Sequence, residues 1–318
     1  MPIVLGPNRY GKAQVRLVRV VRDGAVHHLK DVSVSSSLSG EMRAAHLTGD
    51  NAAVLPTDTQ KNTVYAFARR HGVGQIEDFA LLLARHFVQA HPTIHHARVE
   101  IDEYGWNRRG DHSFVRDGGE VRTCVAHHDA DGRSSVLSGL KDLVVLNSTG
   151  SEFHGFLTDA YTTLRPATDR VLATAVNARW RHTGAERDHR PSGGLSSAVS
   201  SAVSSAAPDG ADDGTSYDAS YDASYDAVRE CLLQAFAGTH SLSLQQTLYA
   251  MGERTLTERP EICEIRLALP NRHHVPVDLS PFGLDNDNEI FYAADRPYGL
   301  IEGTVLREDA PDAGFAWE

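Results

Sequence analysis

The order of secondary-structure patterns constrains this chain most, because a set of two strands, two helices and two strands can be read in it twice. The first set begins with two valine-rich segments that alternate with polar residues on either side of Asp23-Gly24, a dipeptide typical of hairpin turns. Its stronger helix repeats Ile76, Phe79 and Phe87 on one face. We expect this set to comprise strands at residues 13–22, 26–37, 94–104 and 112–117 and helices at residues 61–71 and 75–90, with a further strand at residues 42–48.

The second set follows the same order. We expect its strands at residues 120–128, 134–146, 243–256 and 261–269 and its helices at residues 169–182 and 225–238. Together the sets predict an α+β chain of two tandem ββααββ units, residues 1–118 and 119–318, each an antiparallel sheet with its helices on the outer face. Such sheets leave edge strands that must pair with another copy or another chain, so the pattern also predicts an oligomer.

Composition narrows the classes of function. With 318 residues, of which 41% are hydrophobic, the chain can bury the core of one large domain or of two ordinary ones. Its net charge of -11 argues against a nucleic-acid partner, because binding of polyphosphates draws on clustered Lys and Arg. No segment approaches the ~20 apolar residues that cross a bilayer, so we expect no membrane partner.

The cysteines and the chain ends favour a cytoplasmic protein. Cys124, Cys231 and Cys263 are scattered without C-x-x-C spacing, which suits a reducing compartment and indicates neither a disulfide framework nor a zinc knuckle. The first residues contain no cationic segment leading into a long apolar run. The last three residues, Ala316-Trp317-Glu318, differ from a peroxisomal address of the Ser-Lys-Leu type.

Residues 192–227 form a low-complexity insertion in the second unit. The sequence Ser-Ser-Ala-Val occurs twice within it and Ser-Tyr-Asp-Ala three times. We expect most of it to be mobile, because it buries too little apolar surface to offset a backbone ordering cost of ~1–2 kcal/mol per residue. Alternatively, Tyr217, Tyr221 and Tyr225 have helical spacing and would extend the following helix at its start.

The usual cofactor motifs are missing from the sequence. Gly72-Val73-Gly74 is the nearest approach to a dinucleotide fingerprint, but Glu77 stands at the third glycine position and no βαβ pattern surrounds it. Four adjacent histidine pairs occur, yet neighbouring residues on a strand point to opposite faces, so one pair cannot chelate a single ion. We therefore expect no metal site and interpret the glycines as a turn between helices.

Several short blocks in a fixed order give a stronger signal. They are Tyr10-Gly11-Lys12, Thr57-Asp58, Lys61-Asn62-Thr63, Ser151-Glu152-Phe153-His154-Gly155-Phe156, Tyr161-Thr162-Thr163-Leu164, Asp169-Arg170, Gln245-Gln246-Thr247-Leu248-Tyr249, Leu269-Pro270-Asn271-Arg272-His273 and Gly299-Leu300-Ile301. The ordered set covers nearly the whole chain outside the insertion and resembles the urate oxidase family. This resemblance implies the tunnelling fold, in which two ββααββ units per subunit join partner subunits in an oligomeric barrel. It also implies oxidation of urate by O2 and water to 5-hydroxyisourate and hydrogen peroxide, with no cofactor.

The resemblance implies a role for each substrate-binding residue. Phe153 would stack on the flat purine, and stacking of a base on an aromatic ring contributes ~1–3 kcal/mol. Arg170 would present two parallel donors to a urate carbonyl and ring nitrogen, and Gln245 would complement it on the opposite edge. Leu244 would add a backbone donor, and Asn271 would hold O2 or the attacking water. The pocket walls would include Leu164 and Ile301.

Lys12, Thr57 and His273 would form a proton relay. A threonine hydroxyl is too weak an acid to act alone, so a lysine whose proton affinity is lowered by burial would draw its proton, and the histidine would link the relay to solvent and substrate. Asp58 would position the Thr57 loop at the substrate. Taken singly, these residues have ordinary interpretations: a surface charge for Lys12, a helix N-cap for Thr57 and a strand histidine for His273.

The resemblance also implies active sites shared between subunits. Lys12, Thr57 and Asp58 would come from one subunit of a homotetramer and the other site residues from its neighbour, so a monomer would be inactive. The sequence leaves two alternatives open. One is a pterin-type or guanine-nucleotide enzyme of the same fold, which would need zinc, and the other is a purine-binding or scaffold protein without turnover.

Overall fold

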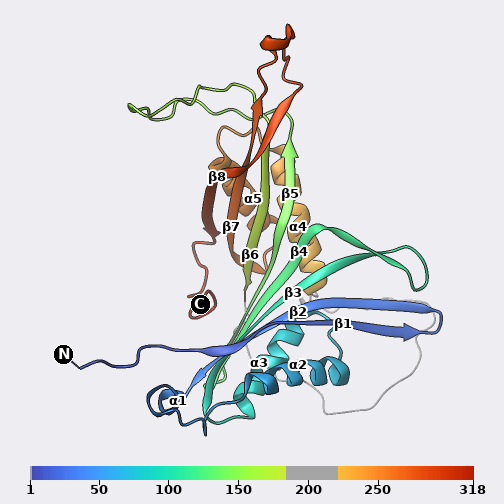
Figure 1. Cartoon of the computed structure of the whole chain (residues 1–318), viewed down its shortest axis with the longest axis vertical. Helices are drawn as coiled ribbons and strands as arrows, with labels where there is room; N and C mark the ends of the chain where they lie inside the picture. Colours follow the sequence, from blue (N-terminus) through green and yellow to red (C-terminus); the bar gives the residue numbers. More distant parts are fainter. Residues whose placement is uncertain (1, 184–220) are drawn as a thin grey trace, which may run out of the picture.

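The computed structural model describes residues 2–183 and 221–318, whose strands form one antiparallel sheet (Figure 1). Within these residues the sheet has eight strands in chain order, so β1 and β8 are its edges. The strands are β1 (Tyr10–Asp23), β2 (Val26–Gly40), β3 (Ile94–Arg108), β4 (Phe114–Asp129), β5 (Ser134–Asn147), β6 (Leu172–His182), β7 (Ile262–Pro276) and β8 (Phe291–Leu306). The helices are α1 (Arg43–Thr48), α2 (Thr57–His71), α3 (Ile76–Gln89), α4 (Tyr221–Gly238) and α5 (Leu244–Glu258), with a short 3-10 helix at Ser280–Phe282.

Each half of the sheet has its own helices and its own core. In the first half α2 and α3 pack on β1, β3 and β4, and Ile76 and Phe87 of α3 are fully buried. In the second half α4 and α5 pack on β5, β7 and β8 around Trp180, Val228 and Met251. Burial of one such side chain contributes about 1.5–3 kcal/mol. The α+β class with an antiparallel sheet is therefore confirmed.

Glycines let α5 lie close against the sheet. A Cβ atom on Gly252 of α5 would lie 2.5 Å from Val305 Cγ2 of β8, and a Cβ atom on Gly303 of β8 would lie 2.8 Å from Leu248 Cδ2 of α5. Real Cβ atoms do not approach other atoms this closely, so larger residues would push the helix away from the strand. This contact fixes the position of α5 and therefore of its first turn.

Two expected elements of the second half are of the opposite type. Residues 169–182 were expected to be helical, but β6 occupies 172–182 between β5 and β7 and is buried on both faces, which hides the alternation of a strand. Residues 243–256 were expected to form a strand, but α5 begins after Ser243. The side chain of Ser243 accepts a hydrogen bond from Gln246 N at 3.2 Å, and the buried residues of α5 have helical spacing.

Other differences between the expected and the observed elements are smaller. Residues 42–48 were expected to be a strand, but most of them form α1, which ends at Gly49 in the left-handed conformation with a φ of 73°. Strand β8 was not predicted, because two glycines and one proline interrupt its apolar pattern. The expected division between residues 118 and 119 falls inside β4, whereas the two ββααββ sets meet between β4 and β5; the boundary of the units stays a prediction.

Most of the insertion at residues 192–227 lies outside the described residues, as does Tyr217. Residues 221–227 are helical, as the alternative interpretation predicted, and form the start of α4. The Tyr221 ring meets His182 edge-on at 5.2 Å between centroids, and the Tyr225 ring lies 6.1 Å from that of Trp180. No helix among the described residues is both long enough and apolar enough to span a membrane.

Candidate active site

A pocket of about 260 Å³ lies where β7 and the loop between β5 and β6 meet. It brings together four predicted site residues, Phe153, Arg170, Asn271 and His273, with the predicted wall residue Leu164. Its other lining residues are Ser148, Arg165, Ala167, Asp169, Val171, His274, Val275, Pro276, Asn288 and Phe291. The pocket therefore has an aromatic ring, a cation, an amide and an imidazole in one small volume.

Strand β7 presents Asn271 and His273 two residues apart. Alternate residues of a strand point to the same face, so both side chains can reach one ligand. The register between β7 and β8 shifts between these two residues, and such irregularities re-aim side chains at functional sites. Asn271 pairs with Thr174 of β6, whose hydroxyl donates a hydrogen bond to Pro270 O at 2.9 Å.

The loop between β5 and β6 holds Phe153 and Arg170 side by side. Phe153 pairs with Ala167 through two backbone hydrogen bonds of 2.8 and 2.9 Å, which close the loop on itself. Arg170 Nε donates to Ser151 Oγ at 3.1 Å, and its Cζ atom lies 5.1 Å from the centre of the Phe153 ring. Burial lowers the pKa of Arg170, but a guanidinium stays charged at neutral pH. The pair suits a flat anionic ligand.

Three further predicted residues lie outside the lining of this pocket. Leu244 is the first residue of α5 and buries its side chain in the second core, which leaves only its backbone to contact a ligand. Gln245 is exposed on the first turn of α5, where the helix dipole favours an anion. Ile301 is half-buried against the second core, opposite Leu269 in β7.

Lys12, Thr57 and Asp58 form a second group in the other half of the chain. Lys12 is half-buried next to a register shift between β1 and β2, where Gln14 adopts a φ of 55°. Thr57 is the first residue of α2 and Pro56 is the N-cap, so the N-cap interpretation of Thr57 is wrong. Hydrogen bonding to Lys61 and the charges of Lys61 and Lys12 lower the pKa of Asp58, which relates Lys12 to the start of α2.

The loop before α2 is held firmly on the sheet. Leu55 N donates to the Tyr10 hydroxyl at 2.9 Å, and the Ser36 hydroxyl donates to Gln60 Oε1 of α2 at 2.7 Å in a buried site. The start of α2 therefore has a fixed position relative to β1 and β2. It belongs to the lower part of Figure 1, whereas the end of β7 lies in the upper part, so the two groups of predicted residues lie apart in one chain.

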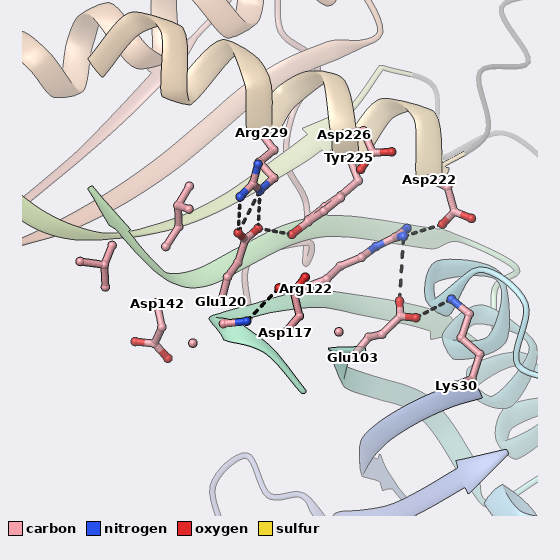
Figure 2. A pocket seen from close by; sticks show the side chains of 15 residues that line it. Lys30, Glu103, Asp117, Glu120, Arg122, Asp142, Asp222, Tyr225, Asp226 and Arg229 are labelled. Carbon is pink, nitrogen blue, oxygen red and sulfur yellow. Dashed lines mark hydrogen bonds and ion pairs between the residues drawn. The ribbon is translucent and has the colours of Figure 1, made fainter. Parts of the chain in front are cut away.

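A larger hollow of about 770 Å³ lies at the junction of the two halves (Figure 2). It contains none of the predicted site residues, and much of its charge is paired internally. Arg122 of β4 bonds Asp222 of α4 at 2.5 Å, while Glu120 accepts hydrogen bonds from Tyr225 and Arg229. We interpret this hollow as the joint between the halves rather than as an active site.

Sequence reasoning missed the connection between the pocket loop and the start of α5. Ser151 and Ser241 form an isolated backbone bridge, and the His240 ring contacts the Glu152 carboxylate at 2.6 Å. Glu152 lies within one of the quoted blocks, but nothing in the sequence indicates its partner. Among the described residues, no group of three or more His, Cys, Asp or Glu side chains is placed to hold a metal ion.

Comparisons with known proteins identify the family of the chain. The uricase family model matches residues 8–127 and 136–302. The chain is 48% identical to the uricase of Arthrobacter globiformis, covering 96% of this chain and 91% of that one, and 34% identical to the uricase of Danio rerio, covering 94% and 93%.

Solved structures extend the comparison to three dimensions. The crystal structure of Arthrobacter globiformis uricase superimposes with a TM-score of 0.85 at 46% identity and covers 100% of this chain and 99% of that chain. Urate oxidase from Bacillus sp. TB-90 has a TM-score of 0.73 at 22% identity, covering 95% and 100%, and supports the fold alone. The chain belongs to the uricase family.

Proposed function

We propose that this protein oxidises urate with O2 and water to 5-hydroxyisourate and hydrogen peroxide. The observation that carries the proposal is the pocket that holds Phe153, Arg170, Asn271 and His273 together. Urate is a flat anion, and this pocket offers it an aromatic face and a guanidinium. Membership of the uricase family supports the same activity.

Each predicted substrate-binding residue of the second half has a proposed role. Phe153 stacks on the purine, and Arg170 donates two parallel hydrogen bonds to one edge of it. Gln245 and the backbone of Leu244 bind the other edge from the start of α5, whose dipole adds to the attraction for an anion. Asn271 holds O2 or water against the exposed face of the ring.

The relay of Lys12, Thr57 and His273 supplies acid and base catalysis. Removal of a further proton from urate makes the ring electron-rich, so that it can transfer two electrons to O2. Water then adds to the oxidised ring, and the products 5-hydroxyisourate and hydrogen peroxide account for every atom of urate, O2 and water. Oriented groups in a small pocket lower the barrier of such a step mainly by positioning and electrostatics.

In this proposal the second half-site comes from another subunit of a homotetramer. Thr57 and Asp58 lie on α2, away from the pocket of the same chain, so one chain alone does not complete the relay. Large apolar side chains of the loop between β5 and β6 are exposed, with Leu157 at 98% and Tyr161 at 90%, as expected for surfaces that a neighbouring subunit covers. The open edges β1 and β8 also need partners.

The activity is tested by mixing metal-chelated protein with urate in aerated buffer and following urate absorbance and peroxide together. Loss of urate with stoichiometric peroxide supports the proposal, whereas binding without turnover supports a binding protein.

Shared sites are tested with hybrids of Thr57→Ala and Arg170→Ala chains. In a hybrid pair, one site receives both substitutions and the other receives neither, so activity should return. Proven hybrids without activity would refute shared sites.

A further inference from the structure

We propose that Glu152, through His240, is a positioning residue that holds the Phe153 loop against the start of α5. This inference rests on the proposed function, because it concerns how two urate-binding segments keep a fixed distance. Phe153 belongs to the loop between β5 and β6, and Gln245 belongs to α5. These segments are far apart in the chain, so a contact between them must set their spacing.

The backbone supplies one part of this contact. Glu152 N donates to Ser241 O at 2.7 Å, and Ser241 N donates to Gly150 O at 2.9 Å. The two serines of the bridge, Ser151 and Ser241, are almost fully buried. The Thr247 hydroxyl of α5 donates to Ser241 Oγ at 2.8 Å, and Arg170 Nε donates to Ser151 Oγ at 3.1 Å. The bridge therefore connects the Arg170 side of the pocket to α5.

The side chains of Glu152 and His240 supply the other part. His240 Nε2 donates to Glu152 Oε1 at 2.6 Å, across the gap between the segment before α5 and the pocket loop. The second oxygen of Glu152 accepts a hydrogen bond from His154 Nε2 at 3.0 Å, which stays within the loop. Hydrogen bonds from His240 and His154 hold the pKa of Glu152 below its ordinary value, so the carboxylate is ionised at neutral pH.

The two histidines make a matched pair for an experiment. Both are exposed, at 61% for His240 and 53% for His154, and both contact the same carboxylate. Only the His240 contact crosses from one urate-binding segment to the other. If the contact between His240 and Glu152 positions the two segments, loss of the His240 side chain should weaken urate binding and loss of the His154 side chain should not.

The experiment compares steady-state kinetics of Glu152→Ala, Glu152→Gln, His240→Ala and His154→Ala in the full-length protein. We expect Glu152→Ala and His240→Ala to raise KM for urate ~3- to 10-fold, as for loss of one partly exposed charge-assisted hydrogen bond. The kcat value should change less than about twofold, because neither residue touches the reacting atoms. Glu152→Gln keeps an acceptor for His240 and should restore most of the affinity.

A double variant and an exchange measurement complete the test. Glu152→Ala with His240→Ala should raise KM no more than Glu152→Ala alone, because both substitutions remove the same contact. Amide hydrogen exchange of residues 150–153 and 241–243 should be faster in both single variants and unchanged in His154→Ala. Exchange is measured without substrate, so it tests the contact even if the protein does not oxidise urate.

Three results would overturn the proposal. KM could stay unchanged in both Glu152→Ala and His240→Ala, His154→Ala could raise KM as much as His240→Ala does, or Glu152→Gln could behave like Glu152→Ala. If the wild-type protein does not oxidise urate but Glu152→Ala and His240→Ala still exchange faster than the wild type, the contact stands and only the proposed function is refuted.

Discussion

Replacement of Arg122 by methionine should reveal how far the two halves of the sheet depend on one cation. Arg122 lies on β4 with 11% of its side chain exposed and donates to Glu77 of α3 at 2.8 Å and to Asp222 of α4 at 2.5 Å. Glu77 is fully buried and also accepts a hydrogen bond from the Ser138 hydroxyl at 2.8 Å. Arg122→Met keeps most of the packing volume and leaves the Glu77 carboxylate without a counter-charge.

The burial of Glu77 and Asp222 determines how much Arg122→Met lowers the free energy of unfolding. Removal of one member of a buried ion pair costs ~3–5 kcal/mol, because the other charge stays desolvated and unpaired. The Asp222 side chain is 53% exposed, so its pair with Arg122 adds only ~0–1 kcal/mol. We expect the free energy of unfolding to fall by ~3–5 kcal/mol. A second substitution, Glu77→Gln, should recover part of this loss because a neutral amide can still bond Ser138.

The loss of unfolding free energy in Arg122→Met should also depend on pH. Burial raises the pKa of Glu77, so the folded state binds this proton more tightly than the unfolded state does. Protonation of Glu77 therefore stabilises the folded state. This stabilisation is fully present below the pKa of ~4.3 that a glutamate has in the unfolded chain, and it is lost as pH rises through the pKa of Glu77 in the folded state. Without Arg122 the folded pKa rises further, so the destabilisation should be smaller at a pH of about 5 than at about 8.

Urea unfolding at one fixed chain concentration measures both effects, with fluorescence of the buried Trp180 as the reporter. Arg254→Met is the control, because Arg254 is 39% exposed and pairs with Glu258 on the same helix, a pair worth ~0.3–0.5 kcal/mol. A loss below about 1 kcal/mol for Arg122→Met, or an equal loss at both pH values, would refute the reasoning.

Four other substitutions test the site and the packing beneath it. Lys12→Ala or Thr57→Ala should lower kcat ~10²- to 10⁴-fold in the urate absorbance assay, as for lost acid and base assistance; near wild-type turnover would remove them from the relay. Arg170→Lys should raise KM for urate ~10- to 100-fold, because an ammonium cannot replace two parallel donors, and an unchanged KM would contradict the clamp. Gly252→Ala should lower the free energy of unfolding by ~1–3 kcal/mol, since its Cβ would lie 2.5 Å from Val305, and unaltered urea unfolding would mean that α5 can shift.

The fold could be predicted from the sequence where an element has one buried face and one face exposed to solvent. Helix α3 was predicted almost to the residue, because Ile76, Phe79 and Phe87 recur on one buried face. Strand β6 lies between β5 and β7, and it was mistaken for a helix because the residues on both of its faces are buried. Such a strand has no alternation to detect, and its alanines, leucine and arginines favour a helix until tertiary contacts override them.

The candidate site was predicted unevenly for a related reason. Ordered blocks identified Phe153, Arg170, Asn271 and His273, and the structure places these four in one pocket. The sequence did not reveal that His240 reaches Glu152, because a contact between segments this far apart depends on the whole second half folding first. Nor did spacing alone predict that Thr57 begins α2 directly after Pro56.

Each of the two groups of predicted site residues lies next to an open edge of the sheet. Lys12 lies beside a register shift in the edge strand β1, and Asn271 and His273 flank a register shift against the other edge strand, β8. In the proposed assembly, contact between the edge of one subunit and that of its neighbour satisfies unpaired backbone groups and completes the relay in the same event. Catalytic competence then requires the same contact that protects the edges, so a chain that fails to assemble is inactive and also exposes the strands most prone to aggregation.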